Sequence, residues 1–142
     1  MPIKQISVPL ENEPGKLNSL CELLEKEEIN IKAIMASSIQ NPVQVHLIVN
    51  DPLKAENVLK SHGYNISTKE VIAVAAPDHP GALNAVLRPL LEAKVNVETL
   101  YPFINLHGDE AIVILEVDNI EGAKKVLKKH WVKTFSTEIY KL

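Results

Sequence analysis

The sequence of 142 residues has one cysteine and no long apolar run. The first argues against a secreted protein and the second against a membrane protein. The single cysteine, Cys21, cannot form an internal disulfide, and a lone thiol suits a reducing compartment, so we expect a cytoplasmic protein. No stretch approaches the ~18 apolar residues of a membrane span, and residues 1–5 carry one positive charge with no apolar run behind it. The sequence therefore predicts neither export nor a membrane anchor.

The chain has fewer basic than acidic residues. It contains 15 Lys and Arg and 18 Asp and Glu, and its formal net charge is −3. Nucleic acids and anionic membranes attract clustered basic residues, so we expect neither as a partner. The histidines show no ligand spacing, which predicts no metal site and no cofactor. Aromatic residues make up only 4% of the chain, and we expect Trp131 and Tyr140 to be packing residues.

What the chain does have is an internal repeat. Residues 14–18 align with residues 80–84 through a shared Pro-Gly dipeptide, and residues 29–31 fall on residues 95–97 in the same register. The agreement needs no gap over this stretch. The chain therefore contains two diverged copies of one unit.

The second half of the repeat aligns after a short insertion. Residues 49–51 match residues 117–119, with two more residues in the second copy than in the first. We place the insertion at residues 40–42 and 105–109, which have the composition of turns. A hairpin loop tolerates such a change in length, so the repeat survives it.

Hydrophobic periodicity predicts the same elements in each copy. Ile6, Val8 and Leu10 alternate with other residues, as in a half-buried strand. A helix follows, with an apolar stripe that is predicted to face the core. The stripe residues are Leu17, Leu20, Cys21 and Leu24 in the first copy and Leu83, Val86, Leu87 and Leu90 in the second.

The remaining predicted elements are a hairpin, a helix and a last strand. The first hairpin pairs residues 30–39 with residues 43–49, and the first of the later helices begins at Asp51-Pro52, an N-cap residue before proline. The later helices cover residues 52–62 and 120–130, and the last strands cover residues 65–70 and 133–140.

The order β-α-β-β-α-β predicts an α+β protein made of two ferredoxin-like units, each an antiparallel sheet with helices on one face. We assign residues 1–70 and 71–142 to two domains. Since residues 67–74 contain no Gly or Pro, the last strand of the first copy should continue into the first strand of the second. Alternation places Ile48, Ile112 and Ile114 on uncovered sheet faces, and exposed apolar faces favour a homodimer.

Three families with this topology can be compared with the residues. A heavy-metal carrier needs a Cys-x-x-Cys pair, and this chain has one cysteine. An RNA-recognition module needs aromatic residues on its central strands, and the first three strands of the first copy have none. Neither family fits.

The third family is the ACT domain, which both copies resemble. The second copy has Asp78-His79-Pro80-Gly81-Ala82-Leu83 followed by Val95-Asn96-Val97, matching the family pattern at each defining position. The first copy has Asn12-Glu13-Pro14-Gly15-Lys16-Leu17 and Ile29-Asn30-Ile31, with Asn in place of Asp. Tyr101-Pro102-Phe103 is similar to the Tyr-x-Phe of stand-alone tandem ACT proteins.

The chemistry of the Pro-Gly loops suits an amino-acid ligand. Gly15 and Gly81 allow strained torsions and close backbone approach, and each precedes a helix whose free N–H groups attract a carboxylate. Asn12 or Asp78 can accept a hydrogen bond from an ammonium group. The two loops differ at several positions, so two unequal sites are expected.

The resemblance implies that the ligand lies between the loop and the second-strand start of a paired unit. The expected ligand-binding residues are Asn12, Glu13, Gly15, Lys16, Leu17, Asn30 and Ile31 in the first copy, and Asp78, His79, Gly81, Ala82, Leu83, Asn96 and Val97 in the second. The alternative is a purely structural role, in which the Pro-Gly loops are only turns and Asn30 and Asn96 cap backbone groups.

The resulting hypothesis is a non-enzymatic regulator that binds a free amino acid at ACT-domain interfaces. With no catalytic domain in the sequence, it would act in trans on a metabolic enzyme. Two alternatives stay open: a small dimeric ferredoxin-like enzyme, and a structural subunit of an enzyme complex with no ligand. The enzyme would need a convergent acid–base or nucleophile set, which the sequence does not display.

Overall fold

The computed structural model describes residues 2–37, 42–104 and 110–142, which form two compact units. The first unit is Lys4–Lys69, and the second is Glu70–Leu142 together with Pro2 and Ile3. The turns predicted at residues 40–41 and 105–109 lie outside the described residues. The division into domains 1–70 and 71–142 stays a prediction.

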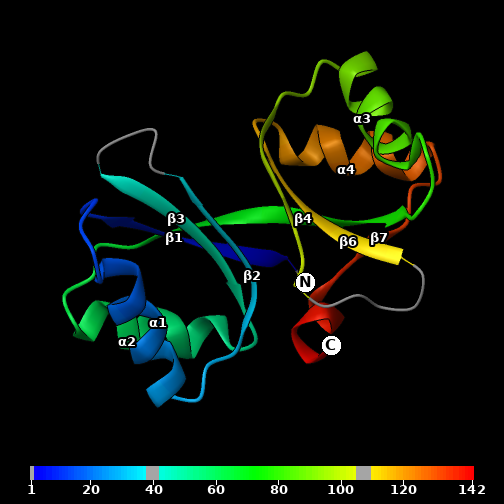
Figure 1. The fold of residues 1–142 in the computed structure, drawn as a ribbon. Coiled ribbons are helices and arrows are strands. Elements are labelled where there is room, and N and C mark those ends of the chain that lie inside the picture. The colour runs from blue at the N-terminus through cyan, green and yellow to red at the C-terminus, as the bar shows by residue number, and fades with distance from the viewer. Residues whose placement is uncertain (1, 38–41, 105–109) are drawn as a thin grey trace. The chain divides into compact units, whose positions relative to one another are not determined.

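The first unit has the predicted order of elements, and the helices α1 and α2 cover one face of its sheet (Figure 1). Its strands follow the order β2-β3-β1, and both neighbouring pairs are antiparallel. The elements are β1 (Ile3–Leu10), α1 (Lys16–Lys26), β2 (Ile31–Ser37), β3 (Val43–Val49), α2 (Pro52–Ser61) and the beginning of β4 (Ser67–Pro77).

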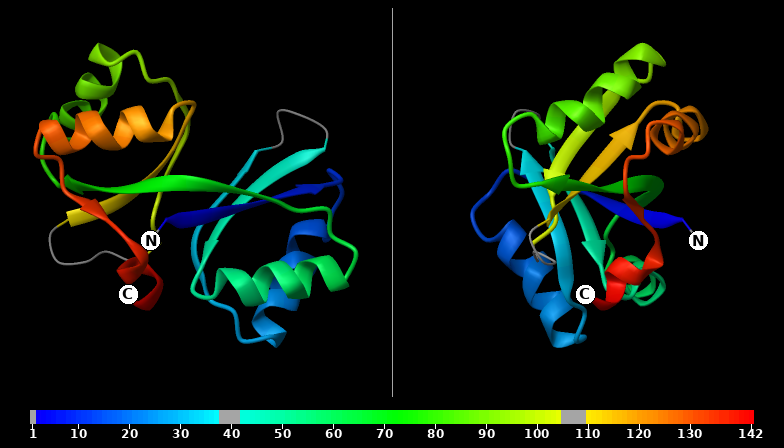
Figure 2. Two further views of the ribbon diagram at one scale, coloured as in Figure 1. Left: turned by 180° about the vertical axis from the view of Figure 1, so that it is seen from behind. Right: turned by 90° about the vertical axis from the view of Figure 1, so that its right-hand side faces the viewer.

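The second unit repeats this arrangement, with α3 and α4 on one face of the sheet (Figure 2). Its strand order is β5-β6-β4-β7, and every neighbouring pair is antiparallel. The elements after β4 are α3 (Ala82–Glu92), β5 (Val97–Pro102), β6 (Glu110–Val117), α4 (Ile120–Lys129), β7 (Thr134–Phe135) and the 3-10 helix η1 (Thr137–Lys141). The α+β assignment is confirmed for both units.

The units repeat each other even in backbone irregularities. A register shift between Ile31 and Ala33 in the first hairpin has its counterpart between Val97 and Thr99 in the second. The residues with positive φ also form equivalent pairs, which are Gly15 and Gly81, Glu28 and Lys94, and Gly63 and Trp131. The internal repeat is therefore present in three dimensions.

Each unit has its own hydrophobic core between the helices and the sheet. The first core contains Ile6, Val8, Leu10, Leu20, Leu24, Ile29, Val45, Leu47, Val49, Ala55 and Leu59. The second contains Ile72, Val74, Ala76, Val86, Leu90, Val95, Val113, Leu115, Val117, Ala123 and Leu127. These lists follow the alternation and the helical spacing of the sequence, which explains why the elements were predictable.

The second helix of each unit begins at a side-chain cap, and the cap of the first unit is the predicted one. The Asp51 side chain accepts from the Lys54 N–H at 3.2 Å, and Pro52 occupies the first helical position. In the second unit the Asn119 side chain accepts from the Gly122 N–H at 3.0 Å. Each cap satisfies one of the amide groups that a helix leaves free at its start.

The apolar stripe of the first helix is only partly buried, which corrects the prediction. Leu20 and Leu24 are fully buried, but Leu17 is 40% exposed and its counterpart Leu83 is 39% exposed. Both leucines stand in the first turn of their helix, directly after the Pro-Gly loop. Cys21 is half-buried rather than buried.

The strand β4 is one uninterrupted element from Ser67 to Pro77, so the predicted continuation between the copies is confirmed (Figure 2). The strand predicted at residues 133–140 is wrong beyond Phe135. There the Ser136 N–H donates to the Glu138 carboxylate at 2.9 Å, a local turn that ends the strand and starts η1.

Ile48, Ile112 and Ile114 belong to neither of the helix-covered cores, in agreement with their predicted place on the other sheet face, and all three are fully buried. One prediction of burial is wrong. Trp131 is 93% exposed rather than packed, because it follows the end of α4 in a left-handed conformation that turns the chain. Among the described residues, no helix is long and apolar enough to cross a membrane.

Candidate functional site

The two Pro-Gly loops have the same internal hydrogen bonds. In the first loop the Glu13 N–H donates to the Glu11 carbonyl at 2.9 Å, and in the second the His79 N–H donates to the Pro77 carbonyl at 2.9 Å. These short turns lead the chain from the end of a strand into a helix. The two loops are thus copies in conformation as well as in sequence.

Gly15 and Gly81 are the N-cap residues of α1 and α3, with φ of 87° and 85°. A Cβ added at either position would meet no atom within 4 Å, so space does not require glycine. The left-handed torsion does, because only glycine adopts it without strain. The predicted torsional role of both glycines is confirmed.

Each loop leaves backbone donors free at the start of its helix. Neither N-cap has a side-chain hydrogen bond, since glycine has no side chain to offer. Among the described residues, no acceptor reaches the N–H groups of Leu17 and Asn18 in α1, or of Leu83 and Asn84 in α3. Two adjacent amides and the positive end of the helix dipole therefore face outward at each loop.

The charges around the two loops differ. In the first loop the Lys16 ammonium lies 3.9 Å from Glu11 and 4.0 Å from Glu13, in exposed ion pairs. In the second loop Ala82 replaces the lysine, and His79 Nδ1 donates to the Pro80 carbonyl at 3.0 Å. The loops have the same backbone but present different groups to a ligand, and the two unequal sites stay a prediction.

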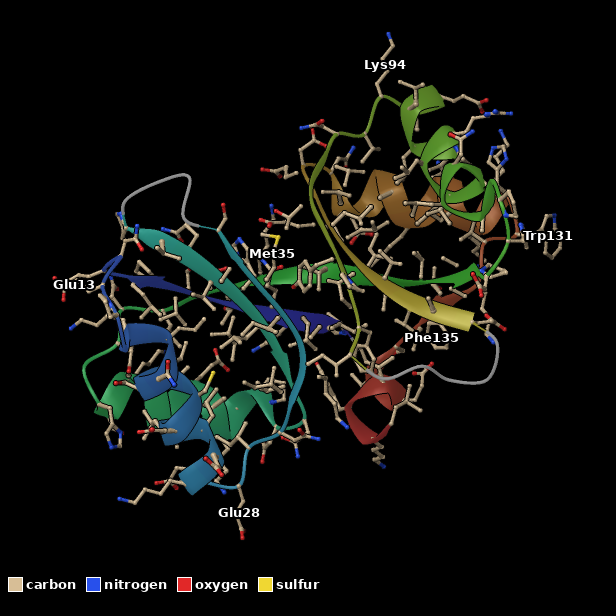
Figure 3. All side chains as sticks on the ribbon, viewed as in Figure 1. Glu13, Glu28, Met35, Lys94, Trp131 and Phe135 are labelled. Atoms are coloured by element: carbon tan, nitrogen blue, oxygen red, sulfur yellow. The ribbon has the colours of Figure 1, made fainter. Side chains whose placement is uncertain are left out.

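The first loop lines a cavity of about 220 Å³. One side is polar and comes from the loop, where Figure 3 shows the Glu13 side chain projecting outward. The other side is apolar and comes from the hairpin of β2 and β3. The lining residues are Leu10, Glu11, Asn12, Glu13, Lys16, Leu17, Ala36, Val43 and Val45, four of which were predicted as site residues.

The predicted second-strand residues Asn30 and Ile31 lie elsewhere, in a cavity of about 430 Å³ beside Cys21 and Glu28. The helix α1 separates them from the loop, and its 11 residues rise ~16 Å from end to end. The fold therefore does not bring the loop and the strand start of one unit together. One amino acid bound within a single unit would not reach both parts.

Asn30 and Asn96 are held through their backbones. The Asn30 N–H donates to Asn50 Oδ1 at 2.9 Å while the Asn50 N–H donates to the Asn30 carbonyl at 3.0 Å. Asn96 and Asp118 form the same reciprocal pair at 2.9 and 3.1 Å. The capping side chains are those of positions 50 and 118, which the sequence interpretation missed although both occur at matched repeat positions.

The second loop has different surroundings from the first. Asp78 and His79 are exposed, and Ala82 is buried. Gly81 lines a cavity of about 420 Å³ on α3, which also contains Arg88, Pro89, Glu92 and His130. The carboxylate of Glu92 lies 3.9 Å from His130 Nε2. Asn96 is exposed and Val97 half-buried at the start of β5.

The titratable groups give little support to a nucleophile. Burial raises the pKa of the Cys21 thiol, which disfavours the thiolate. Tyr101 is 2% exposed, and burial, together with the nearby Glu116 charge, raises the pKa of its phenol. Among residues 2–37, 42–104 and 110–142, no group of three His, Cys, Asp or Glu is placed to hold a metal ion.

Comparison with known proteins adds an independent result. A family model described as an ACT domain pair matches residues 1–138. The structure of protein BT0572 from Bacteroides thetaiotaomicron superposes with a TM-score of 0.91 at 34% identity, covering 100% of this chain and 98% of that chain. No curated protein matches the sequence significantly.

Two more distant structures share the fold. The ligand-free regulatory subunit of aspartate kinase from Thermus thermophilus has a TM-score of 0.65 at 13% identity, with 92% of this chain and 94% of that chain covered. Aspartokinase III of E. coli, in complex with lysine and aspartate, has a TM-score of 0.54 at 15% identity. The match covers 92% of this chain but 31% of that chain.

Proposed function

Because the chain belongs to the ACT domain pair family, we propose that it is a non-catalytic regulatory protein that binds a free amino acid. The observation that carries the proposal is the duplicated Pro-Gly loop, which leaves two free amides at the start of a helix in each unit. The shared fold with a regulatory subunit of aspartate kinase supports it.

The first loop offers partners for every part of an amino acid. The amides of Leu17 and Asn18 suit a carboxylate, as helix N-termini generally do. Asn12 and Glu13 carry oxygens that can accept from an ammonium group. The apolar wall of Val43 and its neighbours would receive the side chain of the ligand.

We further propose that the complete site spans a homodimer. The strand starts at Asn30-Ile31 and Asn96-Val97 would approach a Pro-Gly loop of the second chain. The length of α1, ~16 Å between the loop and the strand start of one unit, exceeds the reach of one amino acid and supports this arrangement. Ligand binding would then change the association of the two chains.

Regulation would act in trans on a metabolic enzyme. The regulatory subunit of aspartate kinase from Thermus thermophilus supports regulation in trans, because the match covers 94% of that chain. We place the protein in the cytoplasm, where a thiol such as that of Cys21 stays reduced.

A thermal-stability screen of the ligand-free protein against the twenty amino acids tests the proposal. A ligand at ~100 times its dissociation constant should stabilise the native state by about 2.7 kcal/mol. The variant Asn12→Ala should lose much of the shift, while Asn57→Ala, an exposed position on α2, should keep it. The absence of a shift with all twenty compounds would contradict amino-acid binding.

A further inference from the structure

A cavity of about 740 Å³ lies in the second unit, lined by residues that belong to neither Pro-Gly loop. Small-molecule sites usually enclose about 300 to 1,000 Å³, so its size suits a ligand. The lining residues are Pro2, Ile3, Glu70, Val71, Ile72, Lys124, Lys128, Trp131, Val132, Thr134, Phe135 and Ser136. They come from α4, the adjoining strands β4 and β7, and the start of β1.

Trp131 on the rim of this cavity is unfavourable for the protein alone. Its φ is 59°, a left-handed torsion that strains a bulky residue, and its side chain is 93% exposed to solvent. Figure 3 shows the indole projecting away from the rest of the unit. The equivalent residue of the first unit is Gly63, which adopts the same torsion without strain. Neither the backbone torsion nor packing in the folded unit favours a tryptophan at this position.

The floor of the cavity is apolar. Ile3, Val71 and Ile72 are buried beneath it, and Phe135 is half-buried beside them. The ammonium of Lys133 stands 5.2 Å from the centre of the Phe135 ring, in a cation–π contact. An aromatic ligand could therefore lie on a preformed surface with the indole at its edge.

The charges in the lining are unbalanced in favour of an anion. Glu70, its one acidic residue, already forms an ion pair with Lys124. Lys128, one turn further along α4, has no acidic partner among the described residues. A bound carboxylate would find a cation at Lys128, whereas an ammonium group would compete with Lys124 for the Glu70 carboxylate.

We propose that this cavity binds an aromatic monocarboxylate that lacks an ammonium group, such as an aryl-substituted carboxylic or 2-oxo acid. The carboxylate pairs with Lys128, and the ring lies on the apolar floor near Phe135 with the indole of Trp131 at its edge. The proposal does not depend on amino-acid binding at the Pro-Gly loops.

The experiment uses the fluorescence of Trp131, the single tryptophan of the chain. The compounds are 3-phenylpropanoate, phenylalanine and 2-phenylethylamine, which share a carbon skeleton but are an anion, a zwitterion and a cation. We expect a saturable change with 3-phenylpropanoate and weaker binding of the other two. Equal binding of phenylalanine at this fluorophore would overturn the assigned ligand class, whatever the stability screen shows.

Two matched variants test the roles of the residues. Lys128→Gln should weaken 3-phenylpropanoate binding about two- to fivefold, the range of an exposed charge pair. Lys129→Gln removes the same charge one residue away, outside the lining, and should leave binding unchanged. Trp131→Gly, followed by calorimetry, should weaken binding at least about twofold. Equal effects of the two lysine variants would refute the proposed carboxylate contact.

Two other occupants are tested in the same instrument. A shift of the emission on dilution of the protein alone would show that a second copy covers Trp131. A shift with phosphatidylglycerol vesicles, but not with 3-phenylpropanoate, would show a membrane-facing surface. Either result, or no saturable response to 3-phenylpropanoate, would overturn the proposal.

Discussion

Gly63 and Trp131 occupy the same position in the two repeats, one residue after the C-caps of α2 and α4, and both have a positive φ, of 85° and 59°. At this position a helix commonly ends with a left-handed residue, most often glycine. The first unit follows that preference and the second does not. The difference predicts opposite responses to substitution.

Trp131→Gly should stabilise the protein by about 0.5 to 1 kcal/mol. The relief of left-handed strain is worth about 1 to 2 kcal/mol, which exceeds the entropy that glycine gains in the unfolded chain, about 0.5 to 1 kcal/mol. The exposed indole has little packing to lose. Urea unfolding followed by circular dichroism measures the change, and Gly63→Ala should shift the midpoint the other way. A less stable Trp131→Gly would mean that the indole packs in solution.

The elements of the fold could be predicted because local patterns determine them. Alternation in β3 and the spacing of Leu20 and Leu24 in α1 point to the buried residues without reference to the rest of the chain. The exposure of Leu17 and the burial of Ile48 could not be predicted, because each depends on what the fold places above that residue. Local patterns do not contain this information.

The candidate sites were predictable to a similar degree. The torsions of Gly15 and Gly81 follow from sequence, since a Pro-Gly dipeptide before a helix commonly requires a left-handed residue. The cavity beside Trp131 was missed, because it combines the chain start, two strands and α4. The alignment of Gly63 with Trp131 was the available signal.

Gly15→Ala should destabilise the protein by about 1 kcal/mol, and Gly81→Ala by a similar amount. The cost comes from the left-handed torsion at the N-cap, since a Cβ at either position has open space around it. Gly15→Asn should cost less, because asparagine tolerates this torsion and also caps helices well. Thermal unfolding of the three variants checks the order. Equal losses of stability in Gly15→Ala and Gly15→Asn would point to a steric clash instead of torsional strain.

Asn50→Ala should destabilise the first unit by about 0.5 to 1.5 kcal/mol, the usual contribution of one hydrogen bond. It removes the side chain that accepts from the Asn30 N–H at 2.9 Å and so loosens the start of β2. Amide hydrogen exchange should show faster exchange at Asn30. Asn57→Ala, at an exposed position on α2, serves as the control and should leave that amide unchanged.

The Cys21 thiol should react slowly with a disulfide reagent in the folded protein. Burial raises its pKa, so at neutral pH the reactive thiolate is rarer than in a free thiol. The reaction rate should rise with pH to a midpoint above that of N-acetylcysteine measured in parallel. The same shift makes stability fall as the pH rises through the raised pKa, because the unfolded chain then releases the proton more readily than the folded one. Unfolding in urea should restore the ordinary reactivity, and a folded-state midpoint equal to that of N-acetylcysteine would refute the assignment.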